Sequence, residues 1–164
     1  MTGRITKSEW QLRPDPRFKD RVLAKFINCV MYDGKKAVAQ RVVYDALEQI
    51  QALIEKEKIE NFPATAIEVF NKAIVNVRPG VEVRSKRVGG ANYQVPMQVS
   101  ARRQQSLAFR WIITAARDEK GKPMANRLSK ELFDAAKGEG KAMATRETTH
   151  KMADANKAFA HFAW

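Results

Sequence analysis

The stretch over residues 78–103 constrains the fold most, because only there do apolar residues alternate with period two. Val81 and Val83 lie two apart on one side of Gly89-Gly90. On the other side, four large apolar residues repeat at the same spacing: Tyr93, Val95, Met97 and Val99. Two such runs separated by paired glycines predict a β-hairpin.

Two registers are open to this hairpin. A three-residue loop, Val88-Gly89-Gly90, would pair Val83 with Val95. The apolar side chains of both strands would then share one face, and we expect this register. A two-residue Gly-Gly turn would instead place the valines opposite glutamine and proline.

The hairpin region is strongly cationic. Glu82 is its only acid, against six basic residues: Arg78, Arg84, Lys86, Arg87, Arg102 and Arg103. A cationic ribbon with an aromatic residue and a glycine tip suits the groove of a polyanion. The alternative is a solvated hairpin whose charges protect an exposed strand edge from pairing.

Overall charge points to the same class of partner. The 164 residues carry a net charge of +12, which favours nucleic acid or an acidic membrane surface as partner. The length fits one domain. We expect no membrane span, because no apolar run is long enough, and no charged-then-apolar signal segment opens the chain. Cys29 is the single cysteine, which suits a reducing cytoplasm, and we expect it to be packed rather than reactive.

Outside the hairpin, apolar residues recur at helical spacing. The first helix is expected to begin at Asp15-Pro16. The second is expected to be capped by Asp33, with Val38 opening its apolar stripe through residue 54. The third is expected to begin at Pro63 and end by Arg78.

Three more helices are expected after the hairpin. Ser100 caps the fourth, Gly121-Lys122-Pro123 separates it from the fifth, and Gly138 ends the fifth. The sixth spans about residues 141–155. Its apolar stripe is thin and consists of Thr148, Met152, Ala155 and Phe159.

The predicted fold is therefore mainly α, a single domain over residues 1–164 of about six helices with a β-hairpin inserted between the third and fourth. Residues 1–13 form a basic N-terminal arm, residues 79–99 the hairpin arm, and residues 156–164 an aromatic tail without regular structure.

Signatures of catalysis are missing from the sequence. It contains no phosphate-binding glycine loop of the GxxxxGK[ST] type and no GxGxxG after a strand. His150 and His161 are the only histidines, and neither stands at a metal-ligand spacing from another histidine or the cysteine. We therefore expect no enzymatic activity, no cofactor and no metal.

Several motifs together resemble one family, bacterial-type small-ribosomal-subunit protein seven. The resemblance covers nearly the whole chain, from Pro14-Asp15-Pro16 to Trp164. It rests on Lys25-Phe26-Ile27-Asn28, Asp33-Gly34-Lys35-Lys36, Val42-Val43-Tyr44, Val77-Arg78-Pro79, the run from Val81 to Gly90, Tyr93-Gln94-Val95-Pro96, Arg110-Trp111 and the run from Met152 to His161.

The resemblance implies a ribosomal protein that binds small-subunit ribosomal RNA and nucleates assembly of the subunit head. It implies a place at the subunit interface, near messenger RNA and the exit-site transfer RNA, with head and platform ribosomal proteins as neighbours. The expected RNA-binding residues are Arg4, Lys7, Arg17, Lys19, Lys25, Lys35, Lys36, Arg78, Arg84, Lys86, Arg87, Tyr93, Arg102, Arg103, Arg110, Arg117, Arg146 and Lys151.

Two other functions are weighed against this one. DNA-bending architectural proteins also use basic β-arms, but they usually carry an apolar wedge at the tip, where this chain has Gly89-Gly90. An RNA-modifying enzyme would need a catalytic constellation that the sequence does not offer.

Overall fold

The computed structural model describes residues 12–57 and 62–162, so the expected contacts of Arg4 and Lys7 lie outside the described residues. The elements run, in order, α2 (Arg21–Val30), α3 (Lys36–Glu57), α4 (Ala66–Val77), β1 (Val81–Val88), β2 (Ala91–Gln98), α5 (Ala101–Asp118), α6 (Met124–Lys137), α7 (Lys141–Ala155) and the 3₁₀ helix η1 (Lys157–Phe162). The mainly α fold, with its hairpin between the third and fourth α-helices of this series, confirms the predicted fold class. No helix of the described part is long and apolar enough to span a bilayer.

The helices of the body enclose one apolar core, to which α2 to α6 and the first turn of α7 contribute. Phe26 of α2 lies at its centre and is fully buried. Its ring makes edge contacts with Phe70 of α4 and Phe109 of α5, each with ring centroids 5.3 Å apart. Aromatic pairs prefer this geometry, so three helices are fixed against one another at a single point.

The start of α2 differs from the prediction. Asp20 is its N-cap, and the side chain of Asp20 accepts the backbone N–H groups of Val22 and Leu23. Asp15 instead closes the preceding turn by accepting the N–H groups of Arg17 and Phe18. Asp20, at the observed start of α2, accepts free N–H groups of the first turn, so Asp15 is not needed as the cap and can take another role.

That role is to join the segment before α2 to α3. Asp15 is buried, and the hydroxyl of Tyr44 donates a 2.7 Å hydrogen bond to its carboxylate. Burial, followed by this hydrogen bond and the charge of Asp15, raises the pKa of Tyr44 to about 12, against an opposing effect of Arg17.

Two further helix starts are corrected. Asp33 does not cap α3, which begins at Lys36 after a turn in which Asp33 and Gly34 both have left-handed φ angles, +51° and +71°. Likewise α4 begins at Ala66 rather than at Pro63, because the side chain of Thr65 accepts the N–H of Glu68 and caps it. The other predicted boundaries, at Ser100, Gly138 and residues 141–155, are confirmed.

The predicted register of the hairpin is wrong. The structure pairs Val81 with Gln98, Val83 with Pro96 and Val88 with Ala91, which leaves a two-residue turn. Gly89 and Gly90 have φ angles of +57° and +89°, a conformation that matches the twist of a two-residue hairpin and that other residues adopt at a cost. The turn chemistry of the two glycines therefore decides the register, over the shared apolar face.

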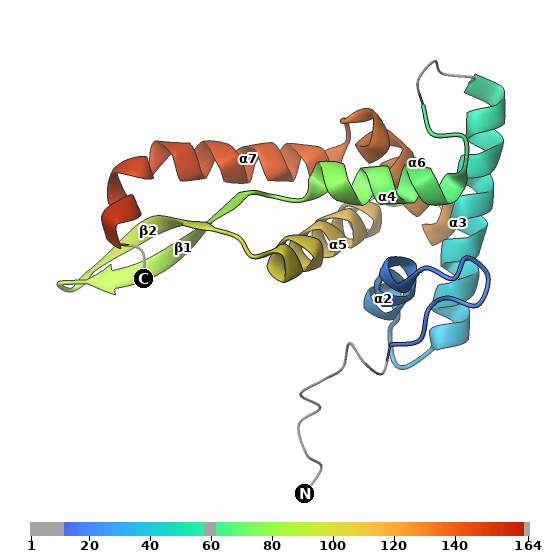
Figure 1. Ribbon diagram of the computed structural model, residues 1–164, viewed down its shortest axis with the longest axis horizontal. Coiled ribbons are helices and arrows are strands. Elements are labelled where there is room, and N and C mark those ends of the chain that lie inside the picture. Colours follow the sequence, from blue (N-terminus) through green and yellow to red (C-terminus); the bar gives the residue numbers. More distant parts are fainter. Residues whose placement is uncertain (1–11, 58–61, 163–164) are drawn as a thin grey trace, which may run out of the picture.

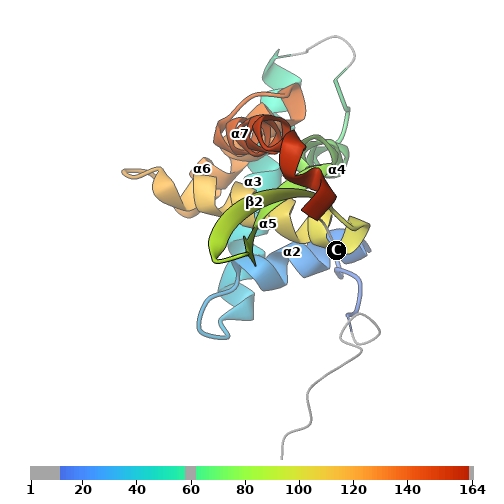
Figure 2. The same ribbon diagram turned by 90° about the vertical axis from the view of Figure 1, so that its left-hand side faces the viewer.

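In this register one face of the hairpin is covered by the C-terminal elements. Val95 is fully buried, and β1 and β2 both contact α7, while β2 also contacts η1 (Figures 1 and 2). The C-terminal segment, predicted to lack regular structure, forms η1 from residue 157 to 162. Its aromatic side chains acquire a partner in Tyr93, which the sequence pattern does not reveal.

The buried face of α7 also differs from the predicted stripe. Thr148, Met152 and Ala155 are exposed, and Ala142, Met143 and Ala153 are buried instead. The inner face of α7 includes polar side chains, because His150 accepts the N–H of Gly80 at 3.2 Å and Arg146 donates to the carbonyl of Asn76 at 2.9 Å. Because α7 docks through polar contacts, the spacing of its apolar residues does not reveal its buried face.

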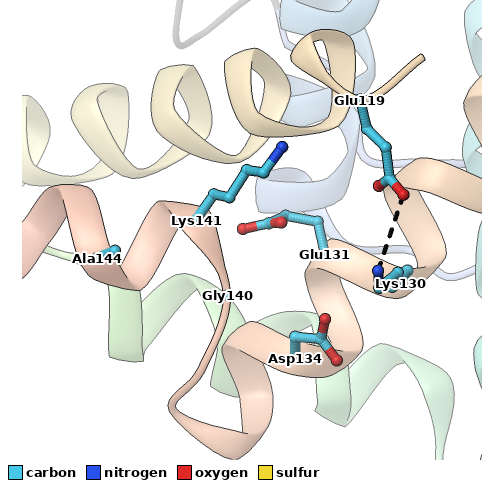
Figure 3. A pocket seen from close by; sticks show the side chains of 7 residues that line it. All are labelled: Glu119, Lys130, Glu131, Asp134, Gly140, Lys141 and Ala144. Atoms are coloured by element: carbon cyan, nitrogen blue, oxygen red, sulfur yellow. Dashed lines mark ion pairs between the residues drawn. The ribbon is translucent and has the colours of Figure 1, made fainter.

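The junction of α6 and α7 is held by a carboxylate (Figure 3). Glu131 of α6 is buried and accepts the N–H of Ala142 at 2.8 Å, so it caps α7 from a neighbouring helix where Gly140 offers no side chain. Burial, with a contribution from Asp134, raises the pKa of Glu131 against the effects of the Ala142 hydrogen bond and Lys141. The pocket around it also contains the Lys130–Glu119 ion pair, so both signs of charge line it.

Candidate nucleic-acid interface

A cationic groove lies between α2 and the first turns of α5, at the base of the hairpin. Arg21 and Lys25 of α2 and Arg102 of α5 line it, together with the polar side chains of Gln105 and Ser106. Its volume is about 480 Å³, and no acid is among the described residues that line it. Leu12, Val22 and Phe109 form the apolar part of its lining. Cations on two helices, with amide and hydroxyl groups beside one of them, suit the phosphate and sugar oxygens of a nucleic acid.

The sequence reasoning missed Arg21 as a groove residue. Arg21, Lys25 and Cys29 are spaced four apart, so they follow one face of α2. That spacing is the signal that could have identified the wall. Cys29 is exposed on this wall, which corrects its expected packed position. Partial burial raises the pKa of its thiol, against an opposing effect of Lys25, so the thiol is protonated at neutral pH.

At the hairpin base, two expected RNA contacts meet a buried acid. Both oxygens of Glu82 are engaged, one by Arg84 at 2.6 Å and the other by Arg103 at 3.2 Å. Arg103 belongs to α5 and Arg84 to β1, so Glu82 ties the hairpin to the body. The two guanidinium groups stay partly exposed, and each retains donors that the carboxylate does not use.

Two residues along the hairpin contact the C-terminal segment. The ammonium group of Lys86 donates a 2.8 Å hydrogen bond to the carbonyl of Phe162. The ring of Tyr93 lies 5.2 Å from that of Phe159 and 5.3 Å from that of Phe162, measured between centroids. We call Tyr93, Phe159 and Phe162 the aromatic clasp. Arg87, next to the glycine turn, is exposed.

Several other residues that were expected to bind RNA contact groups of the protein itself. Arg17 forms a 2.7 Å ion pair with Glu48, and Arg117 donates to the carbonyl of Val30 at 3.1 Å. Arg146 binds the carbonyl of Asn76, and Arg78 follows α4 as its C-cap. The side chains of Arg17, Arg117 and Arg146 therefore stabilise the fold, which leaves them less free to reach a ligand. Arg78 takes part through its backbone N–H, which donates to the carbonyl of Ile74.

The remaining expected residues are exposed and fall into separate places. Lys35 and Lys36 lie at the start of α3, Arg110 in the middle of α5, Lys19 just before α2 and Lys151 on α7. Of the expected residues, the structure places Lys25 and Arg102 on one groove and joins Arg84 to Arg103 through Glu82.

The polar groups of the groove are cations and hydrogen-bonding side chains. In the part of the chain that the structure describes, no group of three or more His, Cys, Asp or Glu side chains is arranged to hold a metal ion. The groove instead presents guanidinium, ammonium, amide and hydroxyl donors, which fit phosphate and sugar oxygens.

Comparison with known proteins gives consistent matches. The family described as "Ribosomal protein S7p/S5e" matches residues 2–157. A protein of Rhodopirellula baltica named "Small ribosomal subunit protein uS7" is 60% identical over 162 residues, covering 99% of each chain. Proteins of the same name from Sphingopyxis alaskensis and Mesorhizobium japonicum are 53% and 51% identical, with full coverage of both chains.

Proposed function

Because the chain belongs to the ribosomal protein S7p/S5e family and is a structural protein of the small ribosomal subunit, we propose that it binds small-subunit ribosomal RNA directly through the face formed by α2, the start of α5 and the hairpin. Within the subunit, this binding nucleates assembly of the head. The hairpin then lies at the subunit interface near messenger RNA and the exit-site transfer RNA, with head and platform proteins as neighbours.

The observation that carries the proposal is the groove between α2 and α5. Arg21, Lys25 and Arg102 approach it from two helices, and the described residues of its lining include no acid. Arg103 follows Arg102 on α5, and Glu82 joins it to Arg84 of the hairpin, where both guanidinium groups stay partly exposed. Cations from several elements facing one channel can follow a phosphate backbone, whereas scattered surface charges cannot.

The hairpin argues against the DNA-bending alternative. Gly89 and Gly90 form the tip, where a bending protein would place an apolar wedge between base steps. The hairpin is also joined to α7 and η1 along one face, so it does not present both faces to a groove.

A salt series tests the proposal. If the cations make roughly 6–10 phosphate contacts, affinity for a small-subunit ribosomal RNA fragment should fall by about 10³–10⁵ between 50 and 200 mM salt. The binding is measured by filter retention with excess duplex DNA as competitor. A flat salt dependence, or equal retention of duplex DNA, would refute specific recognition of ribosomal RNA by this surface.

Matched double variants localise the contacts. Arg21→Ala with Lys25→Ala removes two cations from the groove, and Lys56→Ala with Lys130→Ala removes two exposed cations elsewhere. Both changes reduce the net charge equally. The groove variant should lower the magnitude of the salt slope by about 2, at about one unit per lost phosphate contact, and the control should leave it near the parent value.

A further inference from the structure

Tyr32, in the turn between α2 and α3, is the most exposed of the large hydrophobic side chains identified on the surface, at 73%. The turn that holds it spans residues 32–35 and is closed by a hydrogen bond. The carbonyl of Tyr32 accepts the N–H of Lys35 at 3.0 Å, and the two residues between them adopt left-handed φ angles. An aromatic ring presented to solvent on a closed turn has little internal packing to explain it.

The surroundings of this ring are apolar on one side and cationic on the other. A pocket of about 170 Å³ is lined by six apolar or aromatic residues and two cations: Val30, Tyr32, Val38, Ala39, Val42, Met124, Lys35 and Arg117. Val38, which the sequence places on the buried stripe of α3, is 48% exposed. The pocket is smaller than the roughly 300–1,000 Å³ typical of small-molecule sites, so it fits part of a larger ligand, such as a single ring.

We propose that Tyr32 is a stacking platform for an unpaired nucleobase of the bound RNA, with Lys35 and Lys36 contacting the phosphates on either side. The inference rests on the proposed RNA-binding function and adds a second contact area to it. Unpaired bases of RNA stack on aromatic side chains, and cations beside the ring hold the backbone that carries the base. Cations on the rim favour this occupant over an apolar segment of a protein.

The Tyr32 pocket and the groove share no lining residue, although Val30 of the pocket directly follows Cys29 of the groove in the chain. The α2–α3 turn lies at the lower end of α3, whereas the hairpin extends from the opposite side of the molecule (Figure 1). RNA that reaches both places must pass along the body, so each contact can be removed while the other remains.

The first test separates stacking from charge. Tyr32→Leu should weaken binding to small-subunit ribosomal RNA by roughly 5- to 150-fold with an unchanged salt slope, because stacking involves no counterion release. Tyr32→Phe should bind like the parent, since it keeps the ring. Lys35→Ala with Lys36→Ala should instead lower the magnitude of the salt slope. Val75→Ala, a truncation of another exposed apolar side chain, serves as the control and should change neither quantity.

The second test identifies the base. RNAs carrying a single abasic nucleotide at successive unpaired positions are bound to the parent and to Tyr32→Leu. At the position whose base stacks on Tyr32, the abasic change should weaken RNA binding by the parent and have little further effect on RNA binding by the Tyr32→Leu variant. Melting temperatures close to that of the parent show that the variants are folded, as expected for an exposed site.

Three results would overturn the inference. The Tyr32→Leu variant could bind RNA like the parent, or its loss of affinity relative to the parent could be the same for every abasic RNA. It could also bind RNA normally and fail only to bind a second ribosomal protein, which would assign the pocket to a protein contact. If the parent itself does not prefer ribosomal RNA over duplex DNA, the proposed function fails as well. Selective binding by the parent without a Tyr32 effect removes this inference alone.

Discussion

The body of the protein and its hairpin are held in different ways. The body is joined by one continuous apolar cluster that includes fully buried side chains from α2, α3, α4, α5 and α6. No hairpin residue belongs to that cluster. The contacts that join the hairpin to the rest include the Glu82–Arg103 ion pair, the His150–Gly80 and Lys86–Phe162 hydrogen bonds and the aromatic clasp, and Val95 is buried on the same face.

The two kinds of contact have different consequences, one for the stability of the body and the other for the direction of the hairpin. Apolar burial is non-directional and spread over many residues, so it determines whether the body folds. Ion pairs, hydrogen bonds and ring contacts are directional and few, so they determine where the hairpin points. The proposed RNA surface spans both regions, and its geometry therefore depends on contacts that contribute little to overall stability.

The largest expected effect lies in the body. Phe26→Ala should lower the free energy of unfolding by about 3–5 kcal/mol, because it leaves a cavity where rings from three helices meet. Chemical denaturation measures the loss, and Val75→Ala on the exposed face of α4 is the control. A change below about 1 kcal/mol would mean that the body does not depend on this cluster.

A smaller and local effect is expected at the aromatic clasp. Tyr93→Ala removes two ring contacts, worth about 0.5–1.5 kcal/mol each, and should speed amide hydrogen exchange in β2 and η1. Exchange in α2 and α4 should stay at the parent rate. Tyr93→Phe keeps both ring contacts and should behave like the parent. Faster exchange throughout the body would show that the two regions unfold together.

The α6–α7 junction, which carries the helix on which the hairpin rests, should respond to pH. Since burial raises the pKa of Glu131 above its usual 4.5, the proton is bound more tightly in the folded state. Protonated Glu131 therefore contributes its full stabilisation below the pKa that it has in the unfolded chain. This stabilisation is lost as pH rises through the pKa of Glu131 in the folded protein.

Glu131→Gln removes this titration and keeps an oxygen that can accept the Ala142 N–H. The stability of the parent relative to this variant should fall as pH rises above the usual 4.5 of a glutamate, by less than the effect of Tyr93→Ala. Asp134, whose pKa is also raised by burial, contributes to the raised pKa of Glu131, so the difference between the two proteins includes this coupling. A difference that rises with pH would contradict a raised pKa for Glu131 in the folded protein.

The smallest effect on the body is expected from removing the hairpin itself. Deletion of residues 84–93, closed by a short turn, leaves the apolar cluster of the body intact. The protein should melt cooperatively at close to the parent temperature while binding RNA more weakly. Loss of a cooperative transition, followed by calorimetry, would show that the hairpin is part of the folding unit.

Much of this fold can be read from the sequence, because its signals are local. The end of α6 follows from Gly138, and the hairpin follows from alternation around paired glycines. The predicted register failed where two local signals disagreed, and the conformation of Gly89-Gly90 prevailed over side-chain alternation. The predicted inner face of α7 failed because its contacts are polar and come from distant residues.

The candidate site was predictable in composition but not in arrangement. Charge alone identifies Arg103, Arg146 and Lys86 as cations, yet their partners lie 21, 70 and 76 residues away in the sequence. Only the tertiary structure shows that such residues hold the fold together. It also brings Arg21 of α2 to the same groove as Arg102 of α5.

The separation between Lys86 and Phe162 has a consequence for the order of events during synthesis. The chain grows from its N-terminus at about 5–20 residues per second, so the 76 residues that separate them take roughly 4–15 s to be made. A hairpin forms within microseconds. Once β2 ends at Gln98, 64 residues remain before η1 ends at Phe162, or roughly 3–13 s of synthesis. During that time β1 and β2 exist without η1, the ring of Tyr93 has no partner, and RNA that meets the growing chain encounters a hairpin whose direction is not yet set.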